Sequence, residues 1–229
     1  MSSDYNLSTT LAFLKKIQRN NNREWFLKNK DQYQQAHDQM IFFADAVLAE
    51  MNKQDVIETP SGKKSVFRIY NDVRFSKDKS PYKNYLGGAF RRATKLLRGG
   101  YYYHIEPGNT YVAGGFFNPN AEDLLHIRQQ ISADPSPIMD IVKQREFKKT
   151  FGTLSGDQVK TAPRGFLLDD PGIEFIRYKQ FILKHTFSNE EVLQPDFHLQ
   201  VAKTFHKMRP FLNYMSEILI TDTNGISIV

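Results

Sequence analysis

The chain has 229 residues, 40% of them hydrophobic and 13% aromatic, which is enough for a packed core and excludes disorder for most of its length. It has no cysteine, which excludes disulfides, thiolate zinc sites and cysteine nucleophiles. The formal net charge is +6, the start MSSDYNLSTT is unlike a signal peptide, and no apolar run approaches the roughly 18 residues of a membrane span. These features predict a soluble cytoplasmic protein.

Two helices are expected at the start of the chain. Residues 8–19 carry apolar side chains at helical spacing, with Ser8, Thr9 and Thr10 as N-cap candidates. A second helix is expected to run from its cap, Asn22, through Met51.

Alternation of apolar and polar residues then predicts an antiparallel sheet. Over residues 66–75 it places Phe67, Ile69, Val73 and Phe75 on a buried face, opposite Arg68, Tyr70, Asp72 and Arg74. Further strands are expected over 85–94, 101–106, 110–117 and 179–186, and the first three of these are joined by the turn sequences RGG and PGN.

The remaining segments favour helices. They are expected over 121–132, over 137–149, after Asp170-Pro171 and over 195–219, the last kinked or broken at Pro210. No repeat or linker divides the chain. The sequence therefore predicts an α+β fold in which an antiparallel sheet of about four strands has N-terminal and C-terminal helices packed on one face. Residues 1–220 are expected to form a single domain and 221–229 a loose tail.

Positive charge is concentrated in one segment. Residues 63–98 hold eleven Lys or Arg against two Asp, a local charge of +9, so the rest of the chain is slightly acidic. Such a segregated charge attracts phosphates, nucleic acid or acidic partners.

The most charged stretch, RIYNDVRFSKDKSPYK at 68–83, resembles a bacterial and fungal family catalogued as domain of unknown function 2461. That family shows a block close to R-x-x-R-D-x-R-F-S-x-D-K-x-P-Y-K, and here Asn71 stands where the pattern has its second arginine. The resemblance extends to Asn21-x-x-Glu24-Trp25-Phe26 and to APRGF at 162–166. It implies a single α+β domain and supplies no reaction.

The same stretch is the expected binding site for an anion. Asp72 can neutralise a neighbouring arginine, and a salt-bridged outer sheet face is the competing interpretation. The lysines after Arg74 have only Asp78 nearby, which favours a phosphorylated or carboxylated small molecule as partner. The expected ligand-binding residues are Arg68, Arg74, Lys77, Lys79, Tyr82 and Lys83, with Tyr101, Tyr103, Arg164 and Lys179 as weaker candidates.

Catalysis stays open at this level. Asp72 and His104 are the candidate proton carriers, the latter because it shares a strand face with Tyr102 and Glu106. No arranged nucleophile and base pair is visible, and the familiar phosphate-loop, hydrolase and metalloprotease motifs are missing. Neither a metal site nor a cofactor is predicted, and the oligomeric state is undetermined.

A nucleic-acid-binding module is the alternative, because residues 63–98 interleave aromatic and basic side chains. It requires an open stripe that includes Arg91, Arg92, Lys95 and Arg98, and an affinity that falls steeply with salt. The absence of a known RNA-binding signature speaks against it, as does the expectation that Phe67 and Phe75 are in the core.

Overall fold

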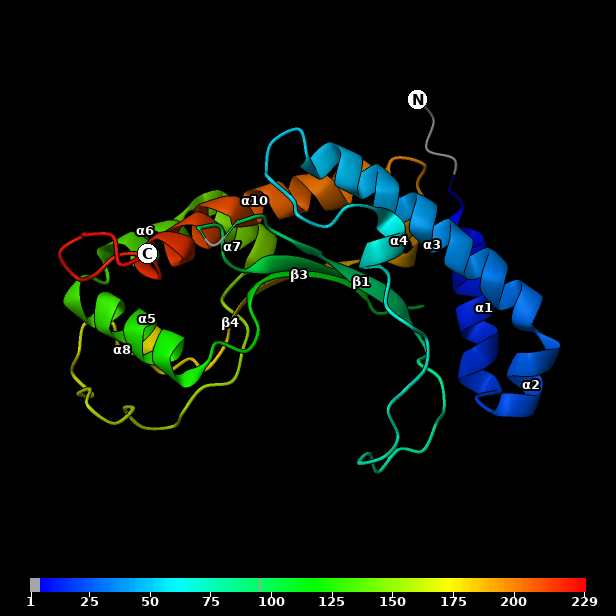
Figure 1. Ribbon diagram of the computed structural model, residues 1–229, viewed down its shortest axis with the longest axis horizontal. Coiled ribbons are helices and arrows are strands. Elements are labelled where there is room, and N and C mark those ends of the chain that lie inside the picture. The colour runs from blue at the N-terminus through cyan, green and yellow to red at the C-terminus, as the bar shows by residue number, and fades with distance from the viewer. Residues whose placement is uncertain (1–4, 95) are drawn as a thin grey trace. The chain divides into compact units, whose positions relative to one another are not determined.

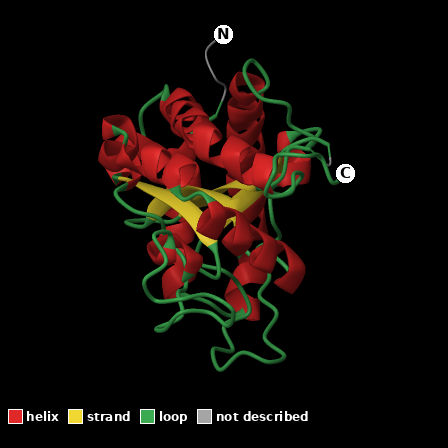
Figure 2. Ribbon diagram, turned by 90° about the vertical axis from the view of Figure 1, so that its left-hand side faces the viewer, coloured by secondary structure: helices red, strands yellow, loops and turns green. Residues whose placement is uncertain are grey.

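The computed structural model describes residues 5–94 and 96–229 and has an α+β architecture, as expected. The strands, drawn as arrows in Figure 1 and in yellow in Figure 2, form one antiparallel sheet. Their order in the sheet is β1-β2-β3-β4. Their bounds are β1 (Leu86–Arg91), β2 (Gly100–Ile105), β3 (Thr110–Phe116) and β4 (Phe181–Phe187). The described helices are α1 (Leu7–Arg19), α2 (Arg23–Lys28), α3 (Lys30–Met51), α4 (Gly62–Ser65), α5 (Ala121–Ala133), α6 (Ser136–Lys143), α7 (Arg145–Phe151), α8 (Ile173–Ile176), α9 (Asn189–Val192) and α10 (Phe197–Ile218).

Asparagines set the boundaries of the N-terminal helices. Asn6, rather than one of the hydroxyl residues 8–10, caps α1 by accepting a hydrogen bond from the Ser8 amide. Asn22 caps α2 as expected and accepts from the Trp25 amide at 2.9 Å. The single helix expected to follow is divided at Asn29, which ends α2 and precedes α3.

Residues 66–75 do not form the strand that the sequence predicted, so that prediction is wrong. The segment pairs with β1 only through the Val66–Gly88 bridge, and it then pairs with its own continuation through the Tyr70–Tyr82 bridge. Ile69 is buried, but Phe67 is 45% exposed and Phe75 is 96% exposed. Alternation predicted burial here, but the segment leaves the sheet before Phe75 and no layer covers that side chain. The other expected strands are confirmed, with β4 as the fourth member of the sheet.

Two compact units can be distinguished along the chain. The first comprises Met1–Phe90, Tyr102–Val112 and Thr186–Lys203, and the second comprises Arg91–Tyr101, Ala113–His185 and Thr204–Val229. The expected single domain over residues 1–220 stays a prediction. None of the described helices is both long and apolar enough to cross a membrane.

In the first unit, N-terminal and C-terminal helices cover one sheet face, as the sequence predicts. Phe43 of α3 lies 6.0 Å from the ring of Tyr103 in β2 and 5.5 Å from the ring of Phe197 at the start of α10. Tyr103 is fully buried, and its hydroxyl lies 2.7 Å from that of Ser65 in α4. Figure 1 shows α3 and α4 on one side of β1.

In the second unit, close backbone packing explains a glycine pair in β3. Gly115 has a φ of +142°, and a Cβ atom there would overlap the carbonyl oxygen of Phe181 in β4. The sequence GG therefore marks close packing between neighbouring strands. Helix α10 continues through Pro210, so the break considered there does not occur. Proline has no backbone N–H, and Pro210 is exposed, so the backbone hydrogen bond that the helix lacks is on its solvent side.

Candidate functional site

The basic segment forms a projecting hairpin, which we call the basic hairpin (residues 68–83). Its two arms are joined by hydrogen bonds from the Asn71 amide to the Pro81 carbonyl at 2.9 Å and from the Lys83 amide to the Ile69 carbonyl at 2.7 Å. The side chain of Asn21 anchors it by donating to the Tyr82 carbonyl at 2.8 Å and accepting from the Tyr82 amide at 3.1 Å. Figure 1 shows the hairpin extending away from the α3 side of β1.

Two of the six expected ligand-binding residues hold this hairpin together. Tyr82 is buried, and its ring stacks on that of Phe26 at 4.0 Å. The ammonium group of Lys83 donates to the carbonyls of Arg68 at 2.6 Å and Tyr70 at 2.9 Å. Burial, followed by the charge of Arg68, lowers the pKa of Lys83. Both side chains therefore have structural contacts in the hairpin.

The other four cations are on the solvent side of the hairpin. Arg74 donates to both carboxylate oxygens of Asp72, from Nε at 2.9 Å and from Nη2 at 2.7 Å. These hydrogen bonds lower the pKa of Asp72, but both side chains are more than half exposed, so the pair adds little stability. Lys79 donates to a backbone carbonyl, whereas Arg68 and Lys77 make no side-chain hydrogen bond or ion pair with the described residues.

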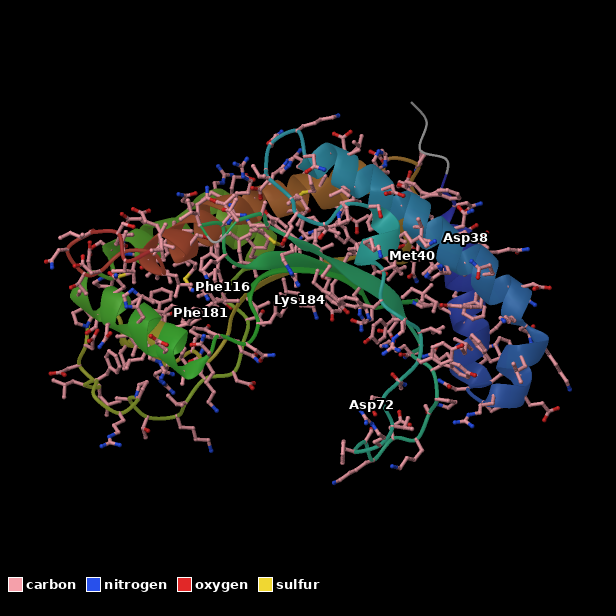
Figure 3. The ribbon with its side chains drawn as sticks, viewed as in Figure 1. Asp38, Met40, Asp72, Phe116, Phe181 and Lys184 are labelled. Carbon is pink, nitrogen blue, oxygen red and sulfur yellow. The ribbon has the colours of Figure 1, made fainter. Side chains whose placement is uncertain are left out.

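An aromatic side chain accompanies these cations. The exposed ring of Phe75 lies 5.9 Å from the Cζ atom of Arg74, and Tyr70 is 53% exposed. Figure 3 shows Asp72 on the projecting part of the hairpin. The expectation that Phe75 is buried in the core, where no ligand could contact it, is therefore wrong.

The described residues do not form the open arginine stripe that the nucleic-acid alternative requires. Arg92 is buried and hydrogen-bonds to Asn213 and Ser216, and Arg98 forms an ion pair with Asp123. Both arginines are thus used inside the second unit, and Lys95 lies outside the described residues.

The weaker ligand candidates are divided between the two units. Tyr101 packs on Phe205 in the second unit, and Tyr103 is in the core of the first. Arg164 and Lys179 are exposed side chains of the second unit.

A second cluster lies on the sheet face of the first unit that is opposite Tyr103. The hydroxyl of Tyr102 lies 2.9 Å from Nδ1 of His104, and Nε2 of His104 lies 3.0 Å from Oε2 of Glu106. The side-chain amides of Asn84 and Asn109 each donate to the Glu106 carboxylate at 2.6 Å. We call these residues, together with Tyr85 and Tyr111, the Tyr–His–Glu cluster.

The two further tyrosines enclose the imidazole. The ring centroids of Tyr85 and Tyr111 lie 4.0 Å and 4.5 Å from that of His104. The ring centroid of Tyr111 also lies 5.8 Å from that of Tyr102. Burial, followed by the two neighbouring phenols, raises the pKa of Tyr102, which therefore stays neutral near pH 7.

The cluster has the arrangement of a general base: a histidine oriented by a carboxylate and hydrogen-bonded to a hydroxyl group. Sequence alternation placed Tyr102, His104 and Glu106 together, but it missed Tyr85 and Tyr111. The signal for these two is their position at the starts of neighbouring strands. Asp72, the other candidate proton carrier, is instead paired with Arg74 in the hairpin.

No metal site accompanies the cluster. Among residues 5–94 and 96–229, no group of three or more His, Asp or Glu side chains is arranged to hold a metal ion. The functional groups of the cluster are phenols, an imidazole and a carboxylate, and these transfer protons or donate and accept hydrogen bonds.

Comparison with known proteins supports the family resemblance. Searches of the curated proteins and of the solved structures gave no match. A model of a family described as conserved hypothetical protein matches residues 9–214, a range that contains both the basic hairpin and the Tyr–His–Glu cluster. The chain therefore belongs to the conserved hypothetical protein family DUF2461.

Proposed function

We propose that the protein binds a phosphorylated or carboxylated small molecule through the exposed cations of the basic hairpin. The observation that carries this proposal is that the residues that stabilise the hairpin differ from the exposed cations on its surface. Asn21, Asn71, Tyr82 and Lys83 maintain its structure, while Arg68 and Lys77 have no side-chain hydrogen bond or ion pair with the described residues.

Arg74 contributes to the same proposal. Its partner Asp72 is exposed, and an exposed ion pair contributes at most about 1 kcal/mol, so a dianionic ligand can displace it. A guanidinium group binds two oxygens of a phosphate or carboxylate at once, as Arg74 binds those of Asp72. Asp72 thus competes with the ligand for Arg74.

A thermal-shift titration with inorganic phosphate, adenosine monophosphate and citrate tests the proposal. We expect at least one of these anions to raise the melting temperature, and we expect Arg74→Ala and Lys77→Ala each to reduce the effect. Asp72→Asn is expected to increase it, because the competing carboxylate is removed. Lys28→Ala is the control, since this exposed lysine belongs to α2. Equal responses in all variants, or no response to any anion, would contradict the proposal.

Single-stranded nucleic acid is a second candidate ligand, favoured by the exposure of Phe75 beside Arg74. Bases stack on exposed aromatic rings at about 1–3 kcal/mol each, and the cations of the hairpin can contact phosphates. This interface is confined to the basic hairpin, because Arg92 and Arg98 are engaged elsewhere.

Fluorescence anisotropy with a labelled single-stranded oligonucleotide distinguishes the two candidates. If nucleic acid is the ligand, its affinity falls between 50 and 200 mM salt, by about fiftyfold if each of the four exposed cations of the hairpin contacts one phosphate. Phe75→Ala should then weaken oligonucleotide binding more than it weakens the response to citrate. If Phe75→Ala leaves oligonucleotide binding intact, the small-molecule proposal is favoured.

A further inference from the structure

We propose that the ligand of the basic hairpin is a nucleotide, in which a phosphate group and a planar aromatic base are joined in one molecule. This ligand class rests on the anion binding proposed above. It follows from the side chains that the tip of the hairpin (residues 72–80) presents to solvent, which include a guanidinium group, an ammonium group and an aromatic ring.

Hydrogen bonds within the tip hold it in shape. The ammonium group of Lys79 donates to the Val73 carbonyl at 2.9 Å and joins the two sides of the tip. The carboxylate of Asp78 accepts from the Ser80 amide at 2.8 Å, and this bond lowers the pKa of Asp78. Both side chains thus have partners in the hairpin itself, so other side chains of the tip have to bind the ligand.

Three side chains of the tip remain for this purpose. Arg74 is bonded to the exposed Asp72, which an anion can displace. Lys77 makes no side-chain hydrogen bond or ion pair with any described residue. Phe75 is 96% exposed, whereas the next most exposed phenylalanine among residues 5–94 and 96–229, Phe42, is 49% exposed. A ligand that covers the ring of Phe75 removes an apolar surface from water, which favours binding.

The ring and the guanidinium group lie side by side. The Cζ atom of Arg74 is 5.9 Å from the ring centroid of Phe75. Arg74 directs Nε and Nη2 at the two carboxylate oxygens of Asp72, and a phosphate that replaces this carboxylate accepts from the same two nitrogens. The phosphate is then bound beside an exposed aromatic ring, on which a base joined to the phosphate can stack.

This arrangement distinguishes a nucleotide from other anions. Citrate and sugar phosphates have no aromatic ring, so they leave the ring of Phe75 in water. An anionic lipid supplies a phosphate, but insertion of Phe75 into an anionic bilayer brings Asp72 and Asp78 against charges of their own sign. Stacking of a base on the ring raises affinity by about five- to 150-fold. A nucleotide therefore uses the cations and the ring together.

Adenosine monophosphate and ribose 5-phosphate are matched probes, because they share the phosphate and the sugar and differ in the base. We expect isothermal titration calorimetry to give a dissociation constant at least about fivefold lower for adenosine monophosphate. Phe75→Leu removes the aromatic ring at an exposed position, so the fold should be unchanged and the two dissociation constants should become equal. Phe42→Leu in α3 is the control and should retain the preference.

The base can belong to a free nucleotide or to a single strand, and both present the same phosphate and ring. A labelled single-stranded oligonucleotide distinguishes the two sources. If it binds more tightly than adenosine monophosphate and Phe75→Leu weakens both, the inference is supported and the strand is the source. If adenosine monophosphate binds more tightly, the inference is supported and the free nucleotide is the source.

Three results would overturn the inference, and they differ in what they imply for anion binding. Equal affinities for the two probes, both lost in Arg74→Ala, would leave anion binding in place but exclude recognition of a base. A preference for adenosine monophosphate that persists in Phe75→Leu would exclude stacking on Phe75. Binding of neither probe, nor of inorganic phosphate or citrate, would contradict anion binding itself, as would binding to phosphatidylserine vesicles in place of all four.

Discussion

The Oε2 atom of Glu106 lies 3.0 Å from Nε2 of His104, and this contact orients an imidazole that is itself buried. Glu106 is held in turn by Asn84 and Asn109, so its position is determined by three polar side chains. The consequence is that a change at Glu106 affects both the tautomer of His104 and the stability of the first unit.

Glu106→Gln is expected to destabilise the protein by about 1–3 kcal/mol, because hydrogen bonds to a charged acceptor are replaced by weaker ones. The glutamine amide can also donate to Nε2 of His104 and so move the ring proton to Nδ1. Urea unfolding measures the first effect and the nitrogen chemical shifts of His104 measure the second. Glu24→Gln, in an exposed ion pair with Lys28, should cost less than about 0.5 kcal/mol and leave the His104 spectrum unchanged.

Arg91 and Arg92 are neighbours in sequence, but charge reversal should destabilise the protein far more at Arg92 than at Arg91. Arg91→Glu changes an exposed position, so its free energy of unfolding should stay within about 1 kcal/mol of wild type. Arg92→Glu places a carboxylate among the acceptor groups of Asn213 and Ser216, at a position only 2% exposed. It should cost about 3–5 kcal/mol or prevent folding. Similar urea midpoints for the two variants would contradict the buried position of Arg92.

Asn21 is expected to control the base of the basic hairpin. Asn21→Ala removes both of its hydrogen bonds to the Tyr82 backbone and should cost about 1–3 kcal/mol. Amide hydrogen exchange should accelerate at Tyr82 and Lys83 more than in α3. Asn20→Ala, which removes one exposed bond to the Lys16 carbonyl, serves as the comparison and should leave exchange in the hairpin unchanged.

Stability should fall in mild acid because of two histidines in the first unit. Burial, as the largest cause, lowers the pKa of His37 and of His198 below the ordinary 6.5. The unfolded chain therefore binds protons at these sites more readily than the folded chain, so their stabilisation is present above pH 6.5 and is lost as pH falls below it. The double variant His37→Gln, His198→Gln should show a smaller decrease in urea midpoint between pH 7.5 and 5.5. An unchanged decrease would exclude these two histidines as its cause.

Local pattern was sufficient for most of the secondary structure. The helical spacing of residues 8–19 and the alternation over 101–106 and 110–117 are properties of short segments, and the structure confirms the elements they predict. Alternation also placed Tyr102 and His104 on one face, because successive residues of a strand point to opposite sides. The sequence by itself thus determined the fold class, the meander and the core of the Tyr–His–Glu cluster.

Tertiary structure decided whether the burial that a sequence pattern predicts occurs in the folded protein. Residues 66–75 alternate as a strand does, yet Phe75 is exposed, because burial depends on a second layer that pattern does not reveal. Arg92 belongs to the same basic run as Arg91 but is buried, because α10 supplies Asn213 and Ser216 as partners from far along the chain. Tyr85 and Tyr111 reach His104 through strand pairing on either side of β2. Each of these outcomes depends on contacts between distant segments, and such contacts have no local sequence signature.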